Sequence, residues 1–349
     1  MWKRTLRIVH FVRQLAMTAL IVMISFLILE QSFRFYCFGF RSFSIPQMNS
    51  VHCLGGTNLV RASAYPEIIY ELKPNLDAYH IMVPLKTNSQ GLRDKEYTLD
   101  KPPHTFRVAV IGDSFTMPEG VALENAFHTL LEDRYNRESS GTLYEFINFG
   151  VAGYDPRQYL ATLKHRALAY QPDFILICLC GYLDNEFLPE ERFHQTFVPK
   201  APERSFLKSF IIEFIRKKIR QQQEAKAQVN DDRLQKLDPI LAELGEISRR
   251  QGIRICLVIL RSYPYFPNGS DTGTKRLAAR DGLFYVDTSP GFNDLNPKKY
   301  RIYPTNRHPN AKAHKIFAET IYQYLQEKRL MEHRPSIRAS INAEDSFLK

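Results

Sequence analysis

Five short apolar segments separated by helical patterns are the feature that most limits what this chain can form. They are RVAVIG (107–112), YEFINFG (144–150), DFILICLC (173–180), IRICLVIL (253–260) and GLFYVD (282–287). Helix-like spacing of apolar residues follows around 124–135, 156–170, 232–251 and 310–327. Apolar strands joined by helices are typical of a parallel sheet covered on both faces. The sequence therefore predicts an α/β domain with three layers, α/β/α.

An uncharged run near the N-terminus predicts a membrane anchor. Residues 14–29, QLAMTALIVMISFLIL, follow four basic residues, Lys3, Arg4, Arg7 and Arg13. A straight span needs about 20 apolar residues, and Arg13 and Glu30 can extend their polar ends to the two interfaces. Basic residues before the run place residues 1–13 in the cytosol. Because no small-residue cleavage site follows, a retained transmembrane signal anchor over 14–31 is favoured over a cleaved signal peptide.

The remaining chain divides by composition. Residues 32–104, with scattered Pro, Asn and Gly, predict an irregular or hairpin lead-in outside the cytosol. Residues 105–328 hold the predicted domain, and 329–349 form a charged tail. The formal net charge of +10 favours an anionic partner, whether lipid, polysaccharide or nucleic acid. No nucleic-acid module is recognisable, so we expect no nucleic-acid partner.

The five cysteines do not predict a metal site. Cys37 and Cys53 lie beyond the anchor, and both a disulfide and two free thiols are open for them. Cys178, Cys180 and Cys256 fall inside apolar segments and are expected to be small buried hydrophobes. No Cys/His spacing is typical of zinc, and we expect no cofactor.

The tripeptide Gly112-Asp113-Ser114 follows the first apolar segment directly. Ligands of open parallel sheets bind at the carboxyl ends of strands. A serine there can point its hydroxyl into the crevice, while backbone N–H groups of the next turn face an oxyanion. The alternative is a turn in which Asp113 or Ser114 caps the following helix.

Two further segments favour catalysis at Ser114. INFGVAGYDPRQYL (147–160) is a second strand that ends in glycines, and YPTNRHPNAKAHKIFAETI (303–321) places His308 just before the last helix. A serine after the first strand and a histidine before the last helix can meet above one sheet edge, as a nucleophile and its base must. The alternative for His308 is a histidine that only begins a helix. His314 is expected to face the sheet or to cap a helix turn.

Together with TNSQGLRDKEY and GDSFTMPEG, these segments resemble the SGNH (GDSL-type) hydrolases, in particular their membrane-anchored bacterial members. The resemblance covers roughly residues 66–328. It implies a flavodoxin-like parallel sheet and cleavage of acyl esters by a serine. It places the nucleophile on Ser114, whose N–H also serves the oxyanion hole, a second oxyanion donor on Gly153, and the base on His308.

Two positions depart from the family's pattern. In FILICLCGYLDNEF, Tyr182 or Leu183 stands where the family has its oxyanion asparagine, and only a register shift brings Asn185 there. The aspartate before the histidine is replaced by Asn306 or Thr305, so Asn306 is the candidate that orients His308. In the best-known triad, exchange of aspartate for asparagine lowers kcat about 10⁴-fold through the wrong tautomer. The site is therefore weakened, assembled differently, or retired.

A basic amphipathic segment, SFLKSFIIEFIRKKIR (205–220), lies inside an insertion at 205–226. Apolar residues recur at helical spacing, at Phe206, Leu207, Phe210, Ile211, Phe214 and Ile215. Basic residues surround them, at Lys208, Arg216, Lys217, Lys218 and Arg220. Such a helix is typical of an anionic membrane surface. The alternative is a helix packed on the domain with a solvated basic edge.

The sequence thus predicts a single-pass protein of the cell membrane with a cytosolic N-terminus and a periplasmic or other extracytoplasmic domain. That domain is expected to cleave or transfer acyl esters of a cell-envelope glycan or lipid. The alternative is a catalytically retired envelope binding or scaffold protein, which the missing Asp and Asn support.

Overall fold

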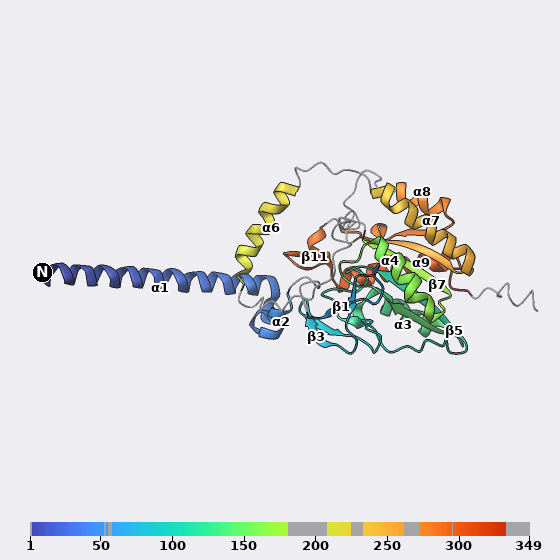
Figure 1. Ribbon diagram of the computed structural model, residues 1–349, viewed down its shortest axis with the longest axis horizontal. Helices are drawn as coiled ribbons and strands as arrows, with labels where there is room; N and C mark the ends of the chain where they lie inside the picture. Colours follow the sequence, from blue (N-terminus) through green and yellow to red (C-terminus); the bar gives the residue numbers. More distant parts are fainter. Residues whose placement is uncertain are drawn as a thin grey trace, which may run out of the picture.

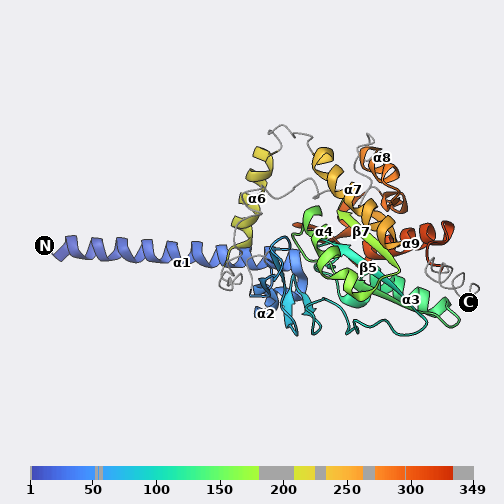
Figure 2. The same cartoon turned by 45° about the vertical axis from the view of Figure 1, so that its right-hand side comes forward.

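The computed structural model describes residues 2–51, 54, 58–180, 208–224, 233–261, 272–294 and 296–332. One long helix, α1, reaches away from the rest of the molecule, and short helices and hairpins lie at its far end (Figures 1 and 2). A sheet with helices on both sides follows.

The central sheet has five parallel strands in the order β6-β5-β7-β8-β9. Their bounds are β5 Thr105–Gly112, β6 Leu143–Asn148, β7 Phe174–Cys180, β8 Arg254–Leu260 and β9 Phe284–Asp287. Each predicted apolar segment forms one of these strands. The chain leaves β5 toward β6 and then crosses back to β7, so the strand order reverses beside the end of β5. In such sheets the crevice at this reversal is where ligands bind.

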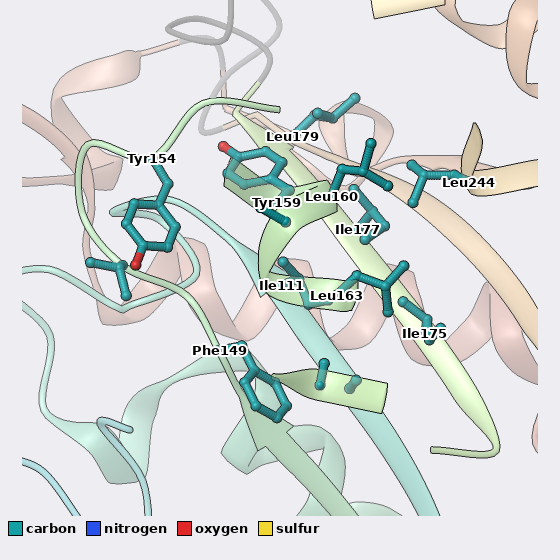
Figure 3. Close-up of a cluster of buried hydrophobic side chains, with 14 of the residues drawn as sticks. Ile111, Phe149, Tyr154, Tyr159, Leu160, Leu163, Ile175, Ile177, Leu179 and Leu244 are labelled. Carbon is teal, nitrogen blue, oxygen red and sulfur yellow. The ribbon is translucent and has the colours of Figure 1, made fainter. Parts of the chain in front are cut away.

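Alternating side chains of each strand face two separate cores. Ile175, Ile177 and Leu179 of β7 join a cluster with α4 and α7, which Figure 3 shows. The intervening Leu176, Cys178 and Cys180 join a cluster with α3 and α9. Both faces of the sheet are therefore covered, as the α/β/α prediction requires, and Cys178, Cys180 and Cys256 are buried as expected. The helices are α3 Phe127–Glu138, α4 Pro156–His165, α7 Arg233–Gln251, α8 Thr272–Arg280 and α9 Ala311–Glu327.

The lead-in folds into two antiparallel hairpins that pack on the sheet domain. The first pairs β1 Val60–Ala62 with β2 Tyr70–Leu72, and the second pairs β3 Asp77–His80 with β4 Val83–Lys86. Their apolar residues belong to the same buried cluster as β5 and β7; examples are Val60, Leu72 and Leu85. The lead-in is thus a part of the domain's core and not a spacer.

Helix α1 runs over Trp2–Phe38 and is longer than the predicted 14–31 anchor. Thr5–Phe43 contains a stretch of 18 residues with a mean hydropathy of 2.1, none of it buried, and is long and apolar enough to cross a membrane. The expectation that Glu30 extends to an interface is wrong. Its side chain is buried, because Glu30 accepts hydrogen bonds from Ser209 and from the first backbone N–H groups of α6 (Phe210–Glu224).

The structure also differs from the prediction at the C-terminal end of the domain and at one helix. Leu330 and Met331 are buried on the sheet, so packing continues past the predicted domain end at 328. Helix α8 was not predicted, because its sequence TGTKRLAAR has few apolar residues. Cys37 is a buried free cysteine, and Cys53 lies outside the described residues.

Candidate active site

Ser114 lies in a tight turn at the carboxyl end of β5. The N–H of Met117 donates to the carbonyl of Asp113 at 2.8 Å, which makes one helical turn, and the Asp113 carboxylate accepts from the N–H of Phe115 at 2.9 Å. No helix follows at once, since α3 begins only at Phe127. Asp113 therefore caps the turn, and the Ser114 side chain is left for chemistry.

His308 meets Ser114 across the sheet edge. It lies on β11 (Asn306–Pro309), a short strand paired with β10 (Arg301–Tyr303) before α9. His308 Nε2 is 2.8 Å from Ser114 Oγ, and the His308 ring lies edge-on to Phe115 with 5.5 Å between centroids. The two residues are 194 positions apart in sequence, and the distance is that of a nucleophile and its general base.

Asn306 occupies the place of the missing aspartate. Its Oδ1 is 2.7 Å from His308 Nδ1 and also 3.0 Å from the backbone N–H of His308. Because a backbone N–H can only donate, the amide oxygen of Asn306 must be on this side. Nδ1 then carries the proton, and Nε2 can accept a hydrogen bond from the Ser114 hydroxyl. The wrong-tautomer problem raised by an asparagine is thus resolved by the local backbone.

A carboxylate that the sequence did not suggest lies on the other side of the ring. Glu119 Oε2 is 2.9 Å from His308 Nε2, and Glu119 Oε1 is 2.6 Å from Nε2 of His80 on β3. Both Glu119 and His80 are buried. The second lead-in hairpin, which carries His80, is therefore linked to His308 through the Glu119 carboxylate.

Arg93 holds the turn that carries Glu119. Its buried guanidinium donates to the backbone carbonyls of Met117, Pro118 and Val121, at 2.7, 2.7 and 2.9 Å, and to the carbonyl of Pro84 at 3.0 Å. Burial lowers the pKa of Arg93 to about 10, so it stays charged at neutral pH. The GLRD segment of the lead-in thus fixes the path of the nucleophile turn.

The turn after β6 lies directly beside that of Ser114. The N–H of Val151 donates to the carbonyl of Gly112 at 3.1 Å, and Asn148 Nδ2 donates to the carbonyl of Thr116 at 2.9 Å. Gly150 is required by this approach, because a Cβ there would lie 2.7 Å from the Thr116 side chain. Gly153, the expected oxyanion donor, follows in the same turn with φ of +84°.

The remaining candidates have other positions. His314 is buried in α9, where its Nδ1 accepts from the N–H of Phe127, the first residue of α3, so the expectation that it caps a helix turn is confirmed. Asn185, Tyr182 and Leu183 lie outside the described residues. Among the residues that the structure describes, no group of His, Cys, Asp or Glu side chains is placed to hold a metal ion.

Neither a protein-family model nor a curated protein matches the chain in sequence. Solved structures similar to it include TesA, with 17% identity over 63% of this chain and 98% of that chain and a TM-score of 0.42. A two-domain esterase active on acetylated mannans has 15% identity over 66% of this chain and 52% of that chain, with a TM-score of 0.43. An acetyl xylan esterase from Geobacillus stearothermophilus has 17% identity over 66% of this chain and 97% of that chain, with a TM-score of 0.41.

The parallel sheet, the two helical layers and the position of Ser114 at the end of β5 are those that the sequence predicts. The parallel five-stranded sheet with helices on both faces confirms the predicted three-layer α/β/α fold.

Proposed function

We propose that this protein is a membrane-anchored serine hydrolase or acyltransferase that acts on acyl esters. The observation that carries the proposal is the chain of contacts Ser114–His308–Asn306, with 2.8 Å and 2.7 Å between the bonded atoms. A hydroxyl on a turn at the strand reversal, next to a correctly oriented imidazole, is the arrangement that covalent acyl transfer needs.

The proposed reaction has two halves. Ser114 Oγ attacks the ester carbonyl carbon while its proton moves to His308 Nε2, and the N–H groups of Ser114 and Gly153 face the oxyanion. The proton then passes to the leaving alcohol as the ester C–O bond breaks. Water repeats these steps on the acyl-enzyme and gives hydrolysis, whereas a sugar hydroxyl gives transfer. We propose a cell-envelope glycan or lipid as the natural substrate, since Phe38 at the end of α1 packs on Tyr303, which pairs with Asn306 beside His308.

The full chain in detergent is expected to release nitrophenol from p-nitrophenyl acetate with saturable kinetics. Free nitrophenol is followed by absorbance, and the Ser114→Ala variant gives the background rate. Acetylated oligosaccharides then test the substrate class through released acetate. A folded wild-type protein with no turnover above this background contradicts the proposal and favours a retired binding protein.

We propose that α1 spans the membrane with the N-terminus in the cytosol. The basic residues that precede the apolar run support this orientation. A reporter fused after Lys349 is then expected to be active only outside the cytosol, and the protein is expected to stay membrane-bound in high salt. A shortened soluble form would support a cleaved signal peptide instead.

We also propose that α6 lies on the surface of the same membrane. One side of α6 packs on α1: the rings of Phe210 and Phe214 lie 5.3 Å from Phe38 and 5.5 Å from Phe33. Another row, Ile212, Ile215 and Ile219, is 43%, 50% and 51% exposed. The apolar surface of α1 next to this junction is exposed as well, and α6 begins beside α1 and runs away from it at a steep angle in both views (Figures 1 and 2).

The occupant that fits this isoleucine row is an anionic lipid leaflet. The row has the spacing of one helix face, it continues the apolar surface of the anchor, and the exposed Arg216 and Lys218 supply positive charge beside it. Because Glu30 and Arg34 fix the start of α6 to α1, the row stays close to the bilayer.

Tryptophan quenching tests this surface contact. The full chain carries Ile215→Trp in a Trp2→Phe background, because Trp2 is its single tryptophan. In acidic vesicles whose acyl chains are brominated, the fluorescence of residue 215 is expected to be strongly quenched. Leu143→Trp, at a comparably exposed position on β6, serves as the matched control and should not be quenched. Equal, weak quenching at both sites would show that α6 does not touch lipid.

A further inference from the structure

Glu119 and Ser114 both lie within hydrogen-bond distance of the same atom, Nε2 of His308. Glu119 Oε2 is 2.9 Å from His308 Nε2, and Ser114 Oγ is 2.8 Å from the same atom. The Glu119 side chain is 7% exposed, and His80 Nε2 lies 2.6 Å from its second oxygen. A buried carboxylate is tolerated where cations or donors satisfy it. Two imidazoles do so here.

The contact between Glu119 and His308 requires a proton. A carboxylate only accepts hydrogen bonds, and Nε2 of a neutral ring that is protonated at Nδ1 also only accepts. Burial raises the pKa of Glu119, but the charge and hydrogen bond of His308, with those of His80, outweigh this and hold it well below its ordinary value. The contact is therefore a hydrogen bond only when Nε2 also carries a proton, that is, when His308 is an imidazolium.

We propose that Glu119, held by His80, supplies the negative charge that stabilises the His308 imidazolium during acyl transfer. This inference rests on the proposed function. In Ser-His-Asp triads an aspartate stabilises the imidazolium from the Nδ1 side, where this chain has the neutral Asn306. Glu119 does so from the Nε2 side, and its partner His80 comes from the lead-in hairpin, outside the predicted hydrolase domain.

Each step of the reaction is compatible with this role. The Ser114 proton moves to Nε2 as Oγ bonds to the carbonyl carbon, and the Nε2–H then lies between Ser114 and Glu119. It leaves with the alcohol oxygen when the ester bond breaks. Glu119 stays ionised and gains no proton, so its contribution is electrostatic, and burial of Glu119 strengthens it.

The same contact makes the resting site sensitive to pH. A carboxylate beside an imidazole favours the protonated ring, and a protonated His308 cannot accept the Ser114 proton. Activity is therefore expected to rise with pH along an acid limb set by loss of the Nε2 proton. Other titratable groups near His308 and Glu119 are Asp113, His80, His314, Tyr303 and Arg93.

The pH dependence of kcat/KM separates this role from a structural one. In Glu119→Gln the acid limb is expected to move to lower pH by about one unit or more. The reason is that an opposite charge within hydrogen-bond distance shifts a pKa by about one to three, and this variant removes that charge from His308. The high-pH plateau is expected to fall about tenfold or more, because the imidazolium loses its counter-charge. Glu119→Ala, which lacks an amide donor, should move the limb in the same direction.

Asp113→Asn is the matched control for the acid limb. Burial raises the pKa of the Asp113 carboxyl to about 6, so this group titrates in the same range. We expect the Glu119→Gln displacement to persist when it is measured in the Asp113→Asn background. Circular dichroism confirms that each variant is folded.

Asn306→Asp tests where the charge is needed. It places a carboxylate at Nδ1, so it is expected to restore most of the lost plateau rate in Glu119→Gln and to raise the rate less in wild type. An unmoved acid limb in both Glu119 variants, or an equal effect of Asn306→Asp in both backgrounds, overturns the inference. If wild type does not turn over esters at all, the proposed function itself has failed, which is a distinguishable result.

Discussion

Replacement of either Ser114 or His308 by alanine is expected to lower kcat/KM for an acyl ester by about 10⁴-fold or more, and the double variant should cost little beyond either single change. The reason is the 2.8 Å contact between the two side chains. A serine hydroxyl is a weak nucleophile until a base accepts its proton, and residues that act as a unit are strongly non-additive. The rates are measured on the full chain with p-nitrophenyl acetate.

His165→Ala is the control for this experiment. His165 stacks on Tyr65 at a ring distance of 4.5 Å, near the lead-in and away from the Ser–His pair, so its loss should leave the rate unchanged. Additive losses from Ser114→Ala and His308→Ala would contradict the account, because they would mean that the two side chains contribute independently.

Arg93→Met is expected to lower the free energy of unfolding by about 3–5 kcal/mol, the cost of breaking a buried charged network. The Arg93 guanidinium satisfies four backbone carbonyls from two segments, and methionine leaves all four without this donor. Unsatisfied buried acceptors cost about 1–3 kcal/mol each before relaxation. The turn that holds Glu119 also loses its support, so residual activity should fall with stability.

Urea denaturation followed by circular dichroism measures this loss. Arg250→Met is the matched control, since the Arg250 side chain is 63% exposed and such surface changes stay within about 0.5 kcal/mol. Equal stability of the two variants would show that water replaces the Arg93 contacts and that the lead-in does not brace the site.

The fold could be predicted because its signals are local. The five sheet strands are apolar along their length, so each was visible as a segment without knowledge of its neighbours. Helix α8 lacks such a local signal. Few of its residues contact the core, among them Ala278, so no apolar pattern marks it in the sequence. The role of Glu30 could not be predicted either, since its partner Phe210 is 180 residues away.

The candidate site was predictable where short motifs mark it. Ser114 and His308 stand in recognisable segments, whereas Glu119 lies inside GDSFTMPEG without a pattern that assigns it a role. Its function depends on His80, which is 39 residues earlier in the chain, and on His308. The signal that was available is a second acidic residue, after Asp113, in a turn made otherwise of small, apolar and hydroxyl residues. Asn306 was predicted as the residue that orients His308, and its contact with the His308 backbone explains how an amide can do so.

The central claim is that Ser114 is an activated nucleophile, and covalent labelling tests it most directly. The full-length protein is treated with a fluorophosphonate, and the adduct is found by intact mass and peptide mapping. The account predicts one adduct, on Ser114, that is absent in Ser114→Ala and forms far more slowly in His308→Ala. A folded wild-type protein that stays unlabelled, or is labelled elsewhere, would contradict the account and leave the fold as a retired scaffold.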